Sequence, residues 1–143
     1  EDFVLDLAGF FEDIYKKQVE ELEQLGIAHF YGFQSDPRPF YAEADCVVLP
    51  SYHEGMSNVL LEAAATGRPV ITSNIPGCRE SVENGKSGLL VEVKNKEMLY
   101  QAMKKMLHCS REEREKMGKA GREKMKREFR KEAVVERTVR SLE

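Results

Sequence analysis

The sequence predicts an α/β fold, with a Rossmann-like parallel sheet flanked by helices and a helical C-terminus. Short apolar runs of four to six residues alternate with helical segments along the chain. Glycine, proline or polar residues follow most of these runs, where turns are expected. Strands that alternate with helices pair in parallel through right-handed crossovers. No internal repeat or low-complexity segment interrupts the alternation.

Five segments are expected to be strands because they are short, apolar and bounded by turn residues. Asp6 is unusual within the first of them, since a charged side chain does not suit a strand that is buried on both faces. The run that stops at Pro50 is expected to be a buried strand. The predicted strands are residues 3–8, 27–31, 46–49, 69–72 and 89–93.

The helices are expected from apolar residues at helical spacing and from glycine or proline at the helix ends. The first is amphipathic, with apolar residues at positions 11, 14, 15, 19, 22 and 25, and is closed by Gly26. The alanine-rich segment after Asn58 is a good helix former that Gly67 ends. The predicted helices are residues 11–25, a short helix containing Phe40, Tyr41 and Ala44, residues 58–66, a short helix reaching Val82, residues 96–107, and residue 111 to the chain end with a break near Phe129.

The composition predicts one soluble globular domain, since 41% of the 143 residues are apolar and 33% are charged. No apolar stretch approaches the roughly 20 residues of a membrane span, and the acidic start does not resemble a signal peptide. Three widely spaced cysteines without a CxxC pair predict free thiols in a reducing, cytoplasmic compartment. No cluster of His, Cys and carboxylates has metal-ligand spacing, so no metal is expected.

The charge is distributed unevenly along the chain. Residues 104–143 contain 14 Lys and Arg against 8 Glu, although the whole chain has a formal net charge of −3. A basic segment can bind nucleic acid or an anionic membrane surface. Here acidic residues are interleaved with the basic ones and the helical spacing persists, so a solvated helix face is the better interpretation. No nucleic-acid partner is expected.

Two glutamates with seven residues between them, Glu54 and Glu62, are the strongest candidates for a functional site. Glu54 lies in the loop after the predicted strand 46–49, and Glu62 lies on the helix that this loop feeds. Ligands of parallel α/β sheets bind at the carboxyl ends of the strands. The loop also contains Gly55, Ser57 and Asn58, whose amides can point at an anion from the positive end of the helix. The pattern predicts a ligand with both hydroxyl and phosphate groups.

Each candidate residue also has a simpler interpretation. Glu62 would suit the solvent edge of an amphipathic helix, but its alanine neighbours and the preceding loop favour a carboxylate that accepts from vicinal hydroxyls, such as those of a ribose. Glu54 could be an exposed turn residue, a carboxylate that orients sugar hydroxyls, or one of a glycosidase pair. Hydrolysis is disfavoured because the chain has no Trp to line a sugar-binding cleft. His53 could be a base or a donor to a hydroxyl, but a lone histidine is more often neither.

Glycines at two predicted strand ends are further candidates. Gly9 could be a simple turn or a point where the backbone approaches a ligand closely. Phe10 and Phe11 replace the glycine-rich phosphate loop of a dinucleotide binder, and the chain contains neither G-x-G-x-x-G nor a P-loop. Binding of NAD or ATP therefore has little support.

Three segments together carry a family resemblance. They are DCVVLPSYHEGMSNVLLEAAATGRPVI at 45–71, PGCRE at 76–80 and NGKSGLLV at 84–91, with the strand end at Gly32 and the segment 41–45 continuing the match. They closely resemble retaining nucleotide-sugar glycosyltransferases of the GT-B fold, in the C-terminal half that binds the donor. The resemblance covers residues 3–129. Within this family, bacterial enzymes that build capsule, O-antigen or other cell-surface polysaccharide are the most similar.

The resemblance implies roles for individual residues. Glu54 would be the catalytic carboxylate and contact hydroxyls of the donor sugar, and Glu62 would bind the ribose of the nucleotide. The amides of Met56, Ser57, Asn58 and Val59, with Gly55, would lie along the sugar and diphosphate. Gly9 and the loop after Gly32 would border the phosphates and the base. The expected donor is a UDP-sugar, used without a metal or other cofactor and without a protein nucleophile.

The resemblance also implies a domain organisation. Residues 1–129 would be a donor-binding domain truncated at its N-terminal side, and 130–143 a C-terminal helix. The acceptor-binding domain of the family and the basic residues that clamp the diphosphate have no counterpart in the sequence, so a fragment inactive on its own is expected. The partners would be a nucleotide diphosphate sugar, a glycan or lipid-linked acceptor, and a second copy through self-association. The full-length protein would be cytoplasmic, with peripheral attachment to the inner membrane face as a further expectation.

Other functions on the same architecture stay open at this point. One is a nucleotide-sugar epimerase or a glycogen synthase-like enzyme, although no catalytic histidine or aspartate constellation favours the epimerase. Another is a non-enzymatic doubly wound interaction domain with a flavodoxin-like sheet. A phosphorylatable aspartate at the end of the first strand would support that alternative, but Asp6 lies inside the strand without an acidic partner.

Overall fold

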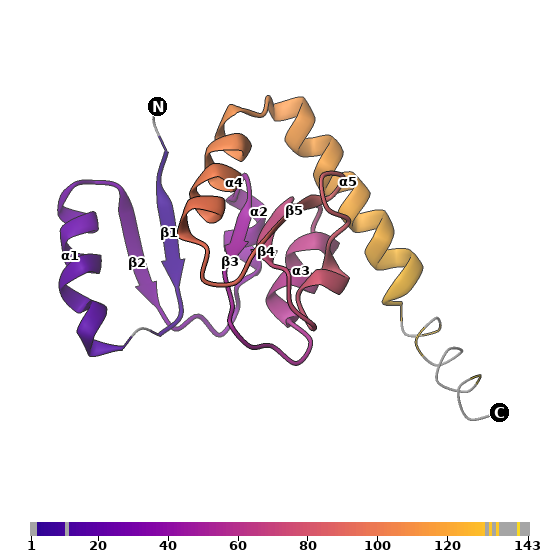
Figure 1. Cartoon of the computed structure of the whole chain (residues 1–143), viewed down its shortest axis with the longest axis horizontal. Helices are drawn as coiled ribbons and strands as arrows, with labels where there is room; N and C mark the ends of the chain where they lie inside the picture. Colours follow the sequence, from indigo (N-terminus) through magenta and orange to yellow (C-terminus); the bar gives the residue numbers. More distant parts are fainter. Residues whose placement is uncertain (1–2, 11, 131, 133, 135–139, 141–143) are drawn as a thin grey trace. The chain divides into compact units, whose positions relative to one another are not determined.

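The computed structural model of the chain describes residues 3–10, 12–130, 132, 134 and 140. They belong to two compact units, residues 1–40 and 41–143, whose helices and strands are labelled in Figure 1. The predicted domain boundary at residue 129 stays a prediction, although Phe129 is the residue that caps the last described helix, α5 (Arg111–Glu128). None of the described helices is long and apolar enough to cross a membrane.

The first unit is one parallel strand–helix–strand motif. Strand β1 (Leu5–Ala8) pairs with β2 (Ala28–Gly32), with Leu5 opposite Ala28. A 3₁₀ turn, η1 (Asp13–Tyr15), and helix α1 (Lys16–Gln24) connect them. The predicted helix 11–25 therefore begins later than expected, and Phe11 lies outside the described residues.

The apolar side of α1 is less buried than the sequence predicts. No residue of α1 is buried, and only Val19 and Leu22 are half-buried. Ile14 and Leu25 stay 69% and 71% exposed. Within its own unit the helix packs on a sheet of only two strands, which is too narrow to cover the whole apolar stripe. The narrow sheet also explains how β1 tolerates the charge of Asp6. The side chain of Asp6 stays exposed and lies 3.7 Å from the His29 ring.

The helix α2 (Arg38–Glu43) forms where the sequence predicts a short helix, although Ala44 lies just beyond its end. Asp36 starts this helix, because its carboxylate accepts a hydrogen bond of 3.1 Å from the N–H of Arg38. The guanidinium of Arg38 also binds the Asp36 carboxylate, and this hydrogen bonding holds the pKa of Asp36 at about 2. Tyr41, on the last turn of α2, is buried.

The second unit contains a three-stranded parallel sheet in the order β3–β4–β5. Its strands are β3 (Val47–Leu49), β4 (Val70–Ser73) and β5 (Gly88–Val91). Helix α3 (Asn58–Ala65) connects β3 to β4, and the 3₁₀ turn η2 (Arg79–Ser81) lies between β4 and β5. The helices α4 (Lys96–His108) and α5 (Arg111–Glu128) follow. The predicted parallel pairing is confirmed for every described strand pair.

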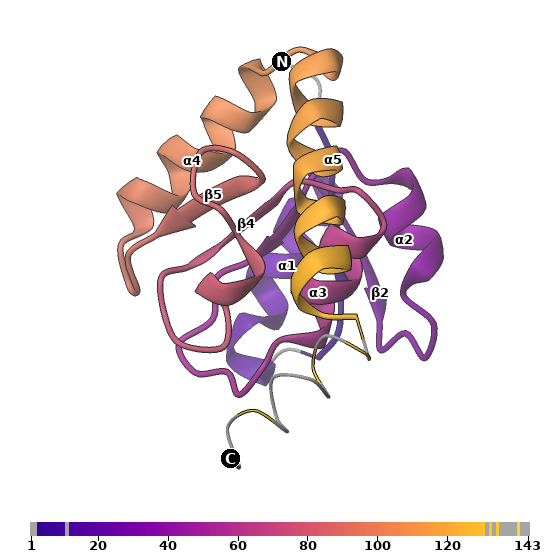
Figure 2. The same cartoon turned by 90° about the vertical axis from the view of Figure 1, so that its right-hand side faces the viewer.

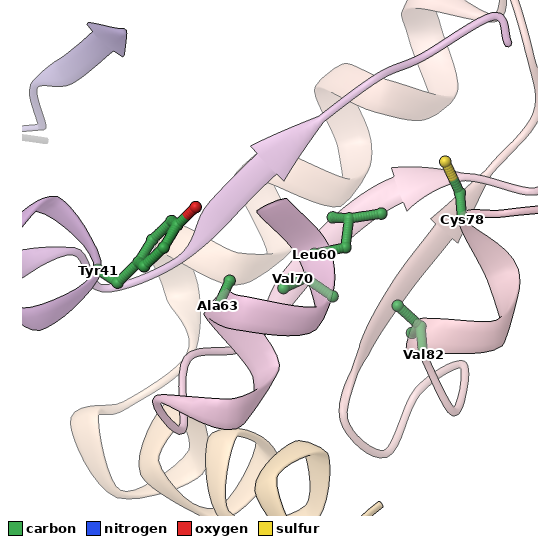
Figure 3. Packing of buried hydrophobic residues seen from close by; sticks show 6 residues of the cluster. All are labelled: Tyr41, Leu60, Ala63, Val70, Cys78 and Val82. Carbon is green, nitrogen blue, oxygen red and sulfur yellow. The ribbon is translucent and has the colours of Figure 1, made fainter. Parts of the chain in front are cut away.

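Alternate residues of β4 point to opposite faces of the sheet and build two separate cores. Val70 packs with Leu60 and Ala63 of α3 on one face, as Figure 3 shows. Ile71 packs with Ala102 and Met106 of α4 on the other face. The sheet is therefore a middle layer between helices, as expected for a Rossmann-like unit.

Helix α5 packs closely against α3, and Figure 2 shows it running along the outer side of that helix. A Cβ atom at Gly118 would lie 1.8 Å from the carbonyl oxygen of Gly67, so only glycine permits this approach. Gly121 faces Ala64 in the next turn at an ordinary contact distance. Ser110 and Glu113 form a capping box that starts α5.

The expected Rossmann-like arrangement of parallel strands flanked by helices is confirmed, with a two-stranded sheet in the first unit and a three-stranded sheet in the second. One expectation about an individual strand is wrong. The strand before Pro50 was expected to be buried, but Val47, Val48 and Leu49 are only half-buried. Both β3 and β5 are edge strands of this sheet, but β5 packs against α4 and α5 and is mostly buried, whereas β3 packs mainly against α3.

Candidate functional site

The loop of residues 50–57 (the 50–57 loop) joins the carboxyl end of β3 to the N-terminus of α3. Ser57 is the N-cap of α3, and its hydroxyl accepts a hydrogen bond from the N–H of Leu60 at 3.5 Å. Gly67 adopts φ +79° just past the other end, as a C-terminal cap requires. The sequence therefore places the start and the end of α3 through its own capping residues, and it directs the positive end of the helix toward the 50–57 loop.

The backbone N–H groups at this end of α3 are largely free to bind a ligand. The first N–H groups of a helix have no partner within the helix. Among the described residues, no hydrogen bond is formed by the N–H of Met56, Asn58 or Val59. The N–H of Ser57, by contrast, donates to the carbonyl of Gly77 at 3.0 Å. Of the four amides expected to face an anion, three are available and one is engaged within the protein.

Glu54 is half-buried in the 50–57 loop and is held by a neighbour. The hydroxyl of Ser51 donates to Glu54 Oε1 at 2.9 Å. The second carboxylate oxygen of Glu54 has no hydrogen-bond partner among the described residues. The carboxylate therefore has a defined position and keeps acceptor capacity for a ligand hydroxyl.

Glu62 lies in the second turn of α3, with an exposed side chain that Tyr41 contacts. The Tyr41 hydroxyl donates to Glu62 Oε2 at 3.2 Å. Burial of the phenol, together with the negative charge of Glu62, raises the pKa of Tyr41 to about 12. Tyr41 thus stays neutral and acts as a donor, and it fixes a carboxylate that can still accept from vicinal hydroxyls.

Gly77 brings the loop after β4 into contact with the 50–57 loop. A Cβ atom at Gly77 would lie 1.9 Å from the carbonyl oxygen of Gly55 and 2.7 Å from that of Glu54. Gly77 also has φ +86°, a conformation that favours glycine. The contact is thus a backbone-to-backbone approach at the carboxyl edge of the sheet, where ligands of α/β sheets bind.

Gly9 and Gly32 belong to the first unit and lie at the carboxyl ends of β1 and β2. The N–H of Gly9 donates to the carbonyl of Gly32 at 2.8 Å. Their φ angles are +131° and +65°, and a Cβ at either position would meet no atom within 4 Å. Glycine is required here by backbone conformation rather than by crowding. Their expected roles beside the phosphates and the base stay predictions.

The described residues offer few alternatives for covalent or metal chemistry. No group of three or more His, Cys, Asp or Glu side chains placed to hold a metal ion occurs among them. Burial raises the pKa of Cys46 to about 12 and also raises the pKa of Cys78. These two thiols are neutral near pH 7 and are poor nucleophiles. The candidate site therefore consists of the free N–H groups at the N-terminus of α3 and of two carboxylates, Glu54 and Glu62, that hydrogen bonds hold in position.

Tyr41, Ser51 and Gly77 contact the expected site residues, although the sequence patterns gave them no role. Tyr41 and Gly77 lie 21 and 22 residues away from the residues they contact, so no local pattern reveals these contacts. Ser51 stands three residues before Glu54, a spacing that is too common in loops to be informative. The available signal was the family resemblance, because Tyr41, Ser51 and Gly77 lie in its segments 41–45, 45–71 and 76–80.

Comparison with family models gives a match over residues 1–124, to the family described as glycosyl transferases group 1. Among individual proteins, the lipopolysaccharide core biosynthesis glycosyltransferase LpsE of Rhizobium meliloti is 31% identical over 124 residues. That alignment covers 87% of this chain and 36% of the relative. The chain therefore spans about a third of the length of this relative.

Solved structures agree with the fold. The sucrose-phosphate synthase of Thermosynechococcus elongatus has a TM-score of 0.80 and 28% identity, and the match covers 96% of this chain and 38% of that one. The Anabaena protein Alr3699/HepE, in complex with UDP, has a TM-score of 0.79 at 22% identity over 97% of this chain and 40% of its own. The expected resemblance to glycosyltransferases of this fold is thereby confirmed. This chain belongs to the family of glycosyl transferases group 1.

Proposed function

We propose that this chain is the donor-binding part of a retaining glycosyltransferase that uses a nucleotide diphosphate sugar, with a UDP-sugar as the expected donor. The acceptor would be a glycan or a lipid-linked sugar in cell-surface polysaccharide synthesis. Family membership favours glycosyl transfer over the epimerase and over the non-enzymatic interaction domain. The sugar-to-acceptor reaction belongs to the whole protein, of which this chain supplies the donor side.

The observation that carries the proposal is the arrangement around the N-terminus of α3. The free N–H groups of Asn58 and Val59 suit the oxygens of a diphosphate. Glu62, fixed by Tyr41 at 3.2 Å, suits the two hydroxyls of a ribose. Glu54, fixed by Ser51 at 2.9 Å, suits hydroxyls of the transferred sugar. A nucleotide diphosphate sugar contains these three groups in one molecule.

The proposed chemistry uses charge stabilisation rather than a protein nucleophile. The bond between the anomeric carbon and the leaving phosphate oxygen breaks, and a bond to the acceptor hydroxyl oxygen forms. The acceptor proton passes to the leaving phosphate. The positive charge that develops on the sugar ring is stabilised by Glu54 and by the leaving phosphate, while the free amides of α3 stabilise the negative charge of the diphosphate. The proposal includes no metal or other cofactor.

A titration of the chain with UDP and UDP-glucose, monitored by calorimetry, tests the proposal. Glu62→Ala should weaken the binding of both ligands by about tenfold or more, because both contain the ribose. Glu54→Gln should weaken the binding of UDP-glucose only, because UDP lacks the sugar. The substitution keeps an acceptor for Ser51, so the loop should retain its conformation.

Glu97→Ala is the matched control, since it removes one negative charge from an exposed position in the first turn of α4. It should leave both affinities unchanged. Equal losses for Glu62→Ala and Glu97→Ala would show a nonspecific charge effect and contradict the proposal. Equal losses of UDP and UDP-glucose binding in Glu54→Gln would contradict the role of Glu54.

A further inference from the structure

Glu80 is connected to the 50–57 loop through Gly77. The N–H of Gly77 donates to Glu80 Oε2 at 2.8 Å. The carbonyl of the same glycine accepts from the N–H of Ser57 at 3.0 Å. Two hydrogen bonds therefore link the Glu80 carboxylate to Ser57, the N-cap of α3. The first is made by the N–H of Gly77 and the second by its carbonyl group.

The Gly77 backbone also approaches the 50–57 loop closely at Glu54 and Gly55. A Cβ at position 77 would overlap the carbonyl oxygens of Glu54 and Gly55, at 2.7 Å and 1.9 Å. Any shift of Gly77 toward the loop is therefore blocked by these carbonyl groups, and any shift away breaks the hydrogen bond to Ser57. The position of Gly77 consequently fixes the backbone that carries Glu54.

Glu80 is placed to determine the position of Gly77. Its carboxylate is part-exposed, and the ion pair that it forms within the described part of the chain, to the Arg79 guanidinium at 3.8 Å, is long and exposed. Such a surface pair contributes little. The hydrogen bond between the charged carboxylate and a buried backbone N–H is the stronger interaction. The left-handed conformation of Gly77, φ +86°, is thus held from one side by Glu80 and from the other by Ser57.

We propose that Glu80 is a positioning residue, which holds the Gly77 peptide so that Glu54 and the free amides of α3 are presented to the donor. This inference rests on the proposed function. Glu80 acts without touching the ligand, through Gly77 and Ser57. A role confined to capping the 3₁₀ turn η2 would affect the Gly77 amide alone, whereas the proposed role extends to Ser57 and to donor affinity.

The test compares Glu80→Ala with Glu80→Gln in the full chain. Glutamine keeps an oxygen that can accept from Gly77, but it lacks the charge. Amide hydrogen exchange at Gly77 and Ser57 should become about three- to tenfold faster in Glu80→Ala, in line with the loss of one hydrogen bond. Glu80→Gln should restore most of the protection. The amides of β4 should exchange at the wild-type rate in both variants, which excludes general destabilisation.

The affinity for UDP-glucose provides the functional readout. Glu80→Ala should weaken binding by about three- to tenfold, and Glu80→Gln should bind nearly as tightly as the wild type. Arg79→Ala, which removes the ion pair but leaves the Glu80 carboxylate, is the matched control and should have no effect. Loss of binding in Glu80→Gln equal to that in Glu80→Ala would overturn the proposal, because charge rather than positioning would then be responsible.

Different results contradict the donor-binding function and the positioning role of Glu80. A wild-type chain that binds neither UDP nor UDP-glucose contradicts the proposed function, and with it the donor-directed part of the role of Glu80. Wild-type binding together with unchanged exchange at Ser57 in Glu80→Ala overturns the positioning role alone. Faster exchange at Gly77 with unchanged exchange at Ser57 would reduce Glu80 to a local cap of η2 and would also overturn it.

Discussion

The hydroxyl of Tyr41 donates a hydrogen bond of 3.2 Å to Glu62 Oε2, and this contact joins α2 to the second turn of α3. Tyr41 also belongs to the buried cluster beside Ala63 and Val70 (Figure 3). A core residue thus orients an exposed carboxylate. A binding site requires such support, because a group that contacts a ligand must be held in position by a packed neighbour, as Tyr41 holds Glu62.

The pKa of Tyr41 provides a first prediction. Its phenol should titrate at about pH 12 in the folded chain, above the usual value of about 10. Because the folded-state pKa is raised, the contribution of Tyr41 to stability is fully present below pH 10 and is lost as the pH rises toward 12. A difference absorbance titration between wild type and Tyr41→Phe isolates this group from the other tyrosines.

Glu62→Ala supplies the control for that titration. Removing the negative charge should lower the pKa of Tyr41 toward its usual value, although burial, the larger cause, keeps the pKa raised. An unchanged titration curve in Glu62→Ala would show that the two side chains do not interact in solution.

Two glycines of α5 should respond differently to the same substitution. Gly118→Ala places a Cβ 1.8 Å from the Gly67 carbonyl oxygen, so α5 must move away from α3. It should lower the free energy of unfolding by about 1–3 kcal/mol. Gly121→Ala places its Cβ 3.6 Å from those of Ala64 and Ser87. It should be neutral or raise that free energy by up to about 1 kcal/mol, since alanine favours helix.

Urea unfolding of the two variants, monitored by circular dichroism, measures this difference. Gly121→Ala is the matched control because it makes the same chemical change one turn away on the same helix. If both variants were stabilised, the close approach of α5 to the α3 C-terminus would not exist in solution.

The exposed apolar side chains of the first unit predict self-association of the chain. Phe10 and Phe33 stack with ring centroids 5.3 Å apart and are 86% and 64% exposed. Ile14 and Leu25 are also largely exposed. Sedimentation velocity should show a concentration-dependent increase of the average mass, because exposed apolar side chains are covered when two copies associate. Phe10→Ser combined with Phe33→Ser should shift the equilibrium toward monomer.

Exposed lysines on the second unit offer a control for that experiment, and Lys119→Ser with Lys126→Ser should leave the association unchanged. A mass that does not depend on concentration in the wild type would contradict the prediction.

Much of the second unit could be predicted from local sequence, since each of its elements has its own start and stop signals. Ser57 and Gly67 delimit α3, and Ser110 with Glu113 starts α5. The apolar runs before Pro50 and after Gly88 gave the strands. Parallel pairing could be predicted from the alternation of strands and helices. Parallel strands need a long crossover connection, usually a helix, because a short hairpin turn joins only antiparallel strands.

The failed expectations concern non-local contacts. The sequence pattern of α1 is amphipathic, yet Ile14 and Leu25 remain exposed, because burial depends on what packs against the helix. The contacts of Tyr41 with Glu62 and of Gly77 with Gly55 join segments more than twenty residues apart, and no periodicity reports such contacts. The motif around Glu54 and Glu62 predicted the place of the site, but not the residues that support it.

The most direct test of the account is the response of individual backbone amides of the isotope-labelled chain to UDP, followed by NMR. The N–H signals of Asn58 and Val59 should move strongly downfield as they begin to donate to the diphosphate, while that of Ser57, already bonded to Gly77, should move less. Glu62→Ala should require more UDP for the same displacement. Shifts confined to residues outside the 50–57 loop and α3, or none at saturating UDP, would contradict the claim that this helix terminus binds the donor.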